Sequence, residues 1–217
     1  MTPTAVCSAI HDVVDRFTVD AALSPARIEE CRRLMYGALP VGGHEPDEFD
    51  RHSEHIALVC RSSGAVMAAV RLVLPVPGRP DCSFPLQLAC RGHLPPGMPA
   101  AASAEVSRFA ISREERRHNE TALMRLALFQ GLIRASAGNG LTHWCAALEP
   151  GLLRLLEMTA VHLIPFGLTV ADGLQPCWNS IHAVLAGVLR DRPPIWEYLT
   201  ENGRIWPGAL VGMRAAS

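Results

Sequence analysis

"EVSRFAISR", residues 105–113, predicts a β-strand that is polar at one end and apolar at the other. Because side chains alternate along a strand, one face should carry Glu105, Ser107, Phe109 and Ile111, and the other Val106, Arg108 and Ala110. Burying a carboxylate or a guanidinium group costs free energy unless the group has a partner. The polar end is therefore either a structural ion-pair site or the floor of a polar cleft.

The composition indicates one globular domain spanning residues 1–217. With 49% hydrophobic and 19% charged residues, the chain can bury a full core and is unlike a disordered sequence. Its formal net charge of −1 argues against general binding of nucleic acid.

The seven cysteines are scattered and form no C-x-x-C pair, which argues against a disulfide framework and against a zinc site. This usage fits a reducing cytoplasm. The first residues lack a basic segment followed by an apolar run, and no stretch approaches the ~18 apolar residues of a membrane span. We therefore expect a cytoplasmic protein with no transmembrane segment and no metal site.

The remaining segments predict a mixed α/β fold in which strands and helices alternate through the middle of the chain. Ser24 and Pro25 are typical of a helix N-cap and first position, so a helix should run from about Pro25 to Ala38. Residues 40–55 are rich in glycine, proline and acids and predict a long loop, a candidate lid or pocket wall. The other expected elements are strands at 16–20, 55–60, 65–75, 141–148 and 161–170, helices at 84–90, 119–137 and 149–160, a strand or helix to about Arg190, and a helix starting at Pro193 and Pro194.

Charged residues recur in these elements at positions where they could meet. Arg32 and Tyr36 are four residues apart and share a helical face. Asp47 and Asp50 lie in the long loop, and Arg71 is the lone charge in its strand. Together with the polar end of the strand at 105–113, they are either a functional network or a set of ion pairs that neutralise one another in the core.

Three further features give weaker signals. Ser107 lacks the G-x-S-x-G turn and the neighbouring base that a serine nucleophile usually has. His52 and His55 have no second cluster to complete a metal site, so we expect them to be solvated or capping residues. Basic side chains at 113–118 predict either a solvated loop or a landing place for an acidic or phosphorylated partner.

Four motifs in order, "RRLMY" (32–36), "DEFDRHSEH" (47–55), "AAVRLVLP" (68–75) and "AEVSRFAIS" (104–112), resemble acyltransferases related to LuxI-type autoinducer synthases, a branch of the GNAT superfamily. "EPGLLRLLEMTAVHLIPFG" (149–167) and "PPIWEYLTENGRIWP" (193–207) are most similar to N-acyl amino acid synthases and exosortase-associated (PEP-CTERM) acyltransferases. The resemblance covers about residues 15–207. It implies a GNAT-like α/β fold with a mixed, largely antiparallel central sheet, a splayed strand pair and flanking helices.

The resemblance also implies an activity, the joining of an acyl thioester to an amine, and the residues that support it. Catalytic positions fall on Glu105 and Ser107. Substrate-binding positions fall on Arg32, Tyr36, Asp47, Asp50, Arg71 and Arg108. Autoinducer synthases typically have a tryptophan six residues after the aromatic, where this chain has Gly42, which disfavours an S-adenosylmethionine pocket. The expected product is an N-acyl amino acid, and the alternatives are homoserine lactone synthesis and a non-catalytic acyl-carrier-binding protein.

The expected donor is an acyl-phosphopantetheine on acyl carrier protein, with no permanently bound cofactor. "REERRHNETA" (113–122) has no glycine where coenzyme A-dependent GNAT enzymes usually have a pyrophosphate loop, which disfavours acyl-CoA. Arg113, Arg116 and Arg117 would instead dock the acidic carrier protein. The positions expected to line the acyl and pantetheine path are Phe109, Ala110, Ile111, Trp144 and Phe166.

Overall fold

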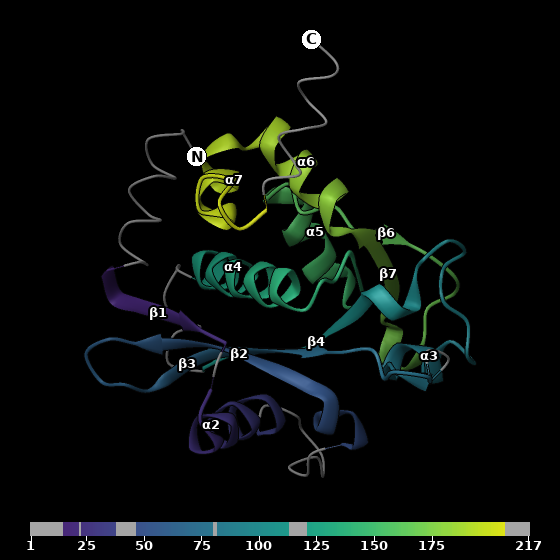
Figure 1. Cartoon of the computed structure of the whole chain (residues 1–217), viewed down its shortest axis with the longest axis horizontal. Helices are drawn as coiled ribbons and strands as arrows, with labels where there is room; N and C mark the ends of the chain where they lie inside the picture. Colours follow the sequence, from purple (N-terminus) through teal and green to yellow (C-terminus); the bar gives the residue numbers. More distant parts are fainter. Residues whose placement is uncertain (1–14, 22, 38–46, 80–81, 113–120, 207–217) are drawn as a thin grey trace.

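The computed structural model describes residues 15–21, 23–37, 47–79, 82–112 and 121–206, which form a seven-stranded sheet with helices on both faces (Figure 1). The sheet order is β1-β2-β3-β4-β5-β7-β6. The strands are β1 (Phe17–Asp20), β2 (Ser53–Cys60), β3 (Val66–Val73), β4 (Ser103–Ile111), β5 (His143–Leu148), β6 (Ile164–Pro165) and β7 (Gln175–Ser180). The helices are α2 (Pro25–Tyr36), α3 (Pro85–Ala89), α4 (Thr121–Gly138), α5 (Pro150–Met158), α6 (Ile181–Asp191) and α7 (Pro193–Thr200).

Every strand pair is antiparallel except β4 and β5, which are parallel. Their pairing is limited to Ser103↔His143, Ala104↔Trp144 and Glu105↔Cys145. Beyond Glu105, β4 continues alongside β3 alone, and β5 continues alongside β7. The two strands therefore separate directly after Glu105, which confirms the splayed strand pair expected from the resemblance.

One face of the sheet is covered by α2, and the other by α4 with α5, α6 and α7 beyond it (Figure 1). The hydroxyl of Ser24 accepts a hydrogen bond from the backbone N–H of Arg27, 3.3 Å away, which starts α2 as the sequence predicts. Cys31, Met35 and Tyr36 then pack against small residues of β2, β3 and β4. The larger core lies between α4 and the opposite sheet face.

A β-bulge in β4 corrects the predicted alternation of side chains. Ala69 pairs with Ala110 and Arg71 pairs with Ser107, so β4 has one more residue than β3 between these two pairs. The backbone accommodates this extra residue at Arg108, whose φ is +55°. An extra residue reverses the faces that follow, so Arg108 lies on the α2 face beside Tyr36 rather than opposite Glu105 and Ser107. The side chains of Phe109 and Ile111 consequently belong to the α4 side, and Ala110 to the α2 side.

Most predicted elements are present, with differences in the second half of the chain. The strand expected at 161–170 is reduced to Ile164–Pro165. The segment expected to be a strand or a helix is both, since β7 passes directly into α6 at Ile181. Helix α4 is as expected, and its predicted cap, Asn119, lies outside the described residues. Of the helices in the described ranges, none is both long and apolar enough to cross a lipid bilayer.

Candidate active site

Arg71 is the centre of a polar network on the α2 face of the sheet. Its side chain is only 1% exposed, and burial at that level requires partners for the guanidinium group. The Nε atom donates to the Ser107 hydroxyl at 3.0 Å. The Nη1 atom donates to Asp47 Oδ1 at 2.6 Å and to the Tyr36 hydroxyl at 3.2 Å, and it lies 3.4 Å from Asp50 Oδ2. The guanidinium group of Arg71 thus links Ser107 of β4 to Tyr36 of α2 and to Asp47 in the segment before β2.

Asp50 is a buried anchor of this network, and both of its carboxylate oxygens face protein groups. Oδ2 accepts hydrogen bonds from the Tyr36 hydroxyl at 2.5 Å and from the backbone N–H of Asp47 at 2.9 Å. Oδ1 lies 3.2 Å from His55 Nε2 and 3.9 Å from Arg32 Nε. Asp50 therefore holds other side chains in place and presents no open carboxylate edge to a substrate.

These contacts shift two pKa values. Burial alone would raise the pKa of Asp50, but His55, the Tyr36 hydroxyl and Arg71 together lower it well below its usual range. Burial and the hydrogen bond to Asp50 raise the pKa of Tyr36 to about 12. Tyr36 is consequently neutral at physiological pH and remains a hydrogen-bond donor to the Asp50 carboxylate.

Arg32, Asp47 and Arg108 form the part of the network that solvent reaches, and we call these three residues the rim. Their side chains are 27%, 29% and 32% exposed, respectively. Arg108 Nη2 lies 3.5 Å from Asp47 Oδ2, and its guanidinium carbon sits 4.9 Å from the centre of the Tyr36 ring. The rim offers one carboxylate and two guanidinium groups to solvent, which complements a zwitterion.

Asp47 is positioned by its own segment. Its side chain caps the short 3₁₀ helix Glu48–His52 by accepting from the backbone N–H of Phe49 at 3.1 Å. Asp50 reciprocates by accepting from the backbone N–H of Asp47, so the two acids close a capping box. The sequence predicted a loop without regular structure here. The described part from Asp47 onward is instead this capped helix followed by β2, and residues 40–46 lie outside the described ranges.

Glu105 lies on the same face of β4, two residues before Ser107, at the last position where β4 pairs with β5. Its side chain is 3% exposed, and Oε2 accepts a hydrogen bond of 2.7 Å from the backbone N–H of Leu86 in α3. Burial raises the pKa of Glu105 to about 7, although the Leu86 N–H and the nearby Arg71 oppose the shift. A carboxyl group with this pKa can accept and release a proton near neutral pH.

Sequence reasoning missed His55. We expected a solvated or capping residue, which is wrong, because the side chain is 3% exposed and faces Asp50. The register places His55 directly opposite Arg71, so strand alternation counted from Arg71 could have identified it. His52 ends the 3₁₀ helix before β2 begins, and its Nε2 atom lies 2.9 Å from the carbonyl oxygen of Ser83. Within the described ranges, no group of three histidine, cysteine or acidic side chains is arranged to hold a metal ion.

The expected acyl-lining residues are only partly brought together. Phe109 and Trp144 both contact Phe129 of α4, with ring centres 6.2 and 6.1 Å apart. Phe166 packs in a different cluster with Phe84 and other residues near α3, and Ala110 faces α2, so neither lies with the aromatic group. Alternation along β4 places Ala110 on the face opposite Phe109 and Ile111, and Phe166 follows β6 instead of belonging to β4 or β5. Ile111 lies in the core on the α4 side.

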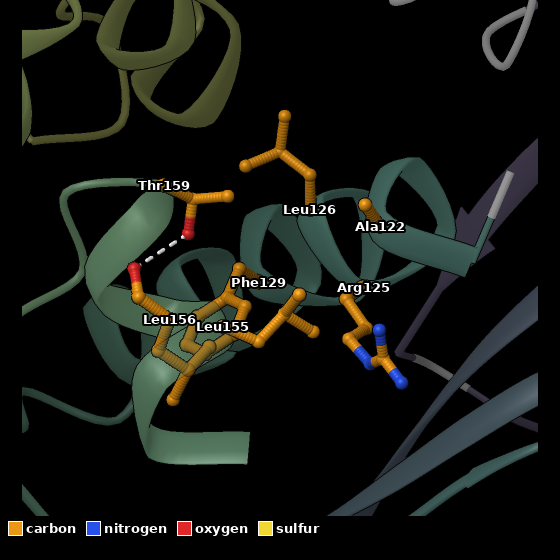
Figure 2. Close-up of a pocket in the computed structure, with 7 residues that line it drawn as sticks. All are labelled: Ala122, Arg125, Leu126, Phe129, Leu155, Leu156 and Thr159. Atoms are coloured by element: carbon orange, nitrogen blue, oxygen red, sulfur yellow. Dashed lines mark hydrogen bonds between the residues drawn. The ribbon is translucent and has the colours of Figure 1, made fainter. Parts of the chain in front are cut away.

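A pocket opens beside Phe129, between α4 and α5 (Figure 2). Apolar side chains of Leu126, Leu155 and Leu156 line it, and Arg125 stands at its edge. Phe129 thus connects this pocket to the aromatic group under the splayed strands. Arg113, Arg116 and Arg117, the predicted docking residues, lie outside the described ranges.

Residues 33–126 match the family model described as an acetyltransferase (GNAT) domain. The fold of the chain is GNAT-like. Solved structures with this fold include the AHL synthase LasI, at 18% identity and a TM-score of 0.57 over 75% of this chain and 87% of LasI. FeeM, an N-acyl amino acid synthase from uncultured soil microbes, has 15% identity and a TM-score of 0.56 over 80% of this chain and 95% of FeeM. BjaI, a CoA-dependent acyl-homoserine lactone synthase solved with SAM and isopentyl-CoA, has 18% identity and a TM-score of 0.55, covering 88% and 89%.

Among curated proteins, none matches the sequence. At these identities the structural likeness concerns the fold, so the GNAT-like architecture expected from the sequence is confirmed. The polar network lies on the α2 face, and the aromatic group and the pocket beside it lie on the α4 face. Glu105 is the last residue of β4 that pairs with β5, and Trp144 of the aromatic group pairs with the neighbouring Ala104.

Proposed function

We propose that this protein is an N-acyltransferase that moves a fatty acyl group from an acyl carrier protein thioester to the amine of an amino acid. The observation that carries the proposal is the position of Glu105. Its carboxyl group, with a pKa of about 7, lies on the same sheet face as the rim and at the last position where β4 pairs with β5, and Trp144 of the aromatic group pairs with the neighbouring Ala104.

The acceptor would bind at the rim. Arg108 and Arg32 carry guanidinium groups that can pair with an amino-acid carboxylate, and Asp47 can bind the ammonium group before it loses its proton. Arg71 and Asp50 lie behind them and hold Tyr36 and Asp47 in fixed positions. Pre-organised partners of this kind lower the free-energy cost of binding and orientation.

The reaction requires an unprotonated amine. Ionised Glu105, directly or through a water molecule, takes a proton from the acceptor ammonium, and the resulting amine attacks the thioester carbonyl. A C–N bond forms, the tetrahedral oxyanion collapses and the C–S bond breaks, and the second proton lost by the nitrogen goes to the departing pantetheine thiolate to give the thiol. Backbone N–H groups of β4 on the side that β5 leaves unpaired are suited to the oxyanion. Ser107, held by Arg71, lies on the acceptor side and would help to orient the amine.

The donor would approach from the α4 side. Its acyl chain would lie against the apolar group of Phe109, Phe129 and Trp144, and the adjoining pocket between α4 and α5, with a volume of about 10 Å³, would have to widen to admit it. Arg113, Arg116 and Arg117 follow β4 in the sequence, and their charge favours an acidic carrier protein. LasI and BjaI, which share the fold, are named as acyl-homoserine lactone synthases, so the lactone reaction is the alternative outcome to test.

The test is a product analysis. Purified protein is incubated with acyl-loaded carrier protein or acyl-CoA, a pool of amino acids and S-adenosylmethionine, and the products are identified by mass spectrometry. An N-acyl amino acid supports the proposal, an acyl lactone supports the alternative, and no product with retained carrier binding indicates a non-catalytic role. Glu105→Gln, checked for folding by circular dichroism, is the negative control.

A further inference from the structure

A second pocket lies far from the rim, between β1, β2, α4 and α7. Its volume is about 170 Å³. Phe17, Val19 and Leu58 provide an apolar floor, and Phe17 and Leu58 belong to the core on the α4 side of the sheet. The pocket is therefore on the sheet face opposite Arg71 and has no residue in common with the candidate active site.

The polar wall of this pocket contains two arginines. Arg61, Gln130 and Arg134 line it, together with Thr18 and Tyr198, and none of the lining side chains in the described ranges is acidic. Glu201 outside the pocket binds Arg134, with Nε and Nη2 each 2.6 Å from the same carboxylate oxygen. An arginine has five N–H donors, so this ion pair anchors the Arg134 guanidinium and still leaves donors for a second anion.

The wall is also held rigidly. The Gln130 side-chain amide donates to the backbone carbonyl of Tyr198 at 2.6 Å, which ties α4 to α7. At Gly131 a Cβ atom would lie 2.4 Å from Ile56 Cγ2 and 2.6 Å from Val19 Cγ1, so α4 packs onto β1 and β2 as closely as a glycine allows. A pocket between elements this tightly packed is largely preformed, which reduces the ordering cost of ligand binding.

We propose that this pocket binds a small monocarboxylate with a compact apolar body. The carboxylate pairs with Arg61 and Arg134, and the body rests on Phe17, Val19 and Leu58. The volume sets the size of the ligand, because a cavity of about 150 Å³ accommodates benzene while drug-sized ligands need about 300 Å³ or more. The inference does not depend on the proposed function, since it uses neither the rim nor Glu105.

Benzoate is the probe, and benzyl alcohol is the matched neutral control of the same size. Isothermal titration calorimetry and amide chemical-shift mapping are performed on the whole chain and on Arg61→Gln, Arg134→Gln and Arg108→Gln. We expect benzoate to bind with a Kd in the millimolar range or tighter and benzyl alcohol at least about tenfold more weakly. Arg61→Gln and Arg134→Gln should each weaken benzoate by about tenfold or more, while Arg108→Gln leaves it unchanged. The shifts should include the amide of Gly131.

The proposal is overturned if benzoate does not bind or if benzyl alcohol binds equally well. It is also overturned if Arg108→Gln abolishes binding while Arg61→Gln retains it, because the carboxylate would then occupy the rim. Arg134→Gln breaks the ion pair with Glu201 and can reduce stability, so Arg61→Gln provides the decisive comparison if Arg134→Gln does not fold.

Discussion

Asp47 and Asp50 are three residues apart, yet burial separates their roles. Asp50 accepts from Tyr36 and from backbone with one oxygen and faces His55 and Arg32 with the other. Asp47 supports Arg71 with one oxygen and turns the other toward solvent-accessible Arg108. We therefore expect Asp50 to stabilise the fold and Asp47 to bind the substrate.

Replacing each acid by its amide tests this division. Asp50→Asn keeps the shape but removes the buried charge that Arg71 and Arg32 face, and we expect a loss of about 3–5 kcal/mol of unfolding free energy. Asp47→Asn retains the helix cap, because asparagine also caps, and should cost about 1 kcal/mol while raising KM for the amino-acid acceptor. Urea unfolding and steady-state kinetics measure the two effects. Equal stability losses would contradict the assignment.

Glu105 makes stability and activity depend on pH in opposite directions. Its folded pKa of about 7 exceeds the ordinary value of 4.5, so the folded state binds more protons than the unfolded state between those values. Its contribution to stability is complete below pH 4.5 and is lost as pH rises through 7, with a total of about 3 kcal/mol. Turnover should rise over the same interval because the base must be ionised.

Glu105→Gln should flatten this decline in stability between pH 5 and 8 and lower turnover by about 100-fold or more. Urea unfolding at several pH values and the pH–rate profile give the two measurements. Asp50 does not interfere, because its lowered pKa stabilises the fold above its ordinary range and that contribution is lost only in acid. A variant with normal turnover would refute the role of Glu105 as the base.

At the scale of elements, local patterns predicted most helices and strands but not the bulge. Ser24 and Pro25 start α2, and the strands expected at 55–60 and 65–75 are present as β2 and β3, because each signal acts within a few residues. The bulge depends on how β4 pairs with β3, and "EVSRFAISR" contains no glycine or proline to mark it. Strict alternation therefore placed Arg108 on the wrong face, while the family resemblance still assigned it to the site.

The backbone at Arg108 supplies a test of the bulge. A non-glycine residue with positive φ carries a conformational cost, and a β-branched residue carries more. Arg108→Gly and Arg108→Val both remove the guanidinium group, so their difference isolates the backbone. We expect the valine variant to be less stable than the glycine variant by about 1–3 kcal/mol in urea unfolding. Identical stabilities would mean that β4 relaxes to a regular strand.

At the scale of the whole molecule, the site joins residues from α2, the segment before β2, and strands β2, β3 and β4. Periodicity could identify these elements but not their order in the sheet, because pairing between distant strands leaves no local signal. The order of four motifs supplied that information through the resemblance. It failed for Phe166, which lies just beyond β6, because that strand covers only Ile164–Pro165 at the sheet edge instead of extending over 161–170.

Recognition of the donor depends on how charge is distributed over the surface. The chain has a net charge of only −1, but the segment that follows β4 in the sequence is rich in basic residues. If that segment docks an acidic carrier protein, reversing Arg116 and Arg117 to Glu should raise KM for the carrier-linked donor about tenfold. The variant should also lose most of the salt dependence seen between low and ~0.5 M salt, because screening acts on the attraction that the change removes. Steady-state kinetics with acyl carrier protein and with a small thioester measure both effects.

The matched control is Arg79→Glu with Arg91→Glu, which makes the same change in net charge at two exposed positions between β3 and β4. We expect this control to leave the carrier KM nearly unchanged, because steering depends on where the charge lies and only weakly on the total. A small thioester donor has no acidic surface to attract, so its KM should be equal in all three proteins. If the Arg116 and Arg117 changes impair both donors alike, those residues act on the reaction site or the fold, and carrier docking must be assigned to another surface.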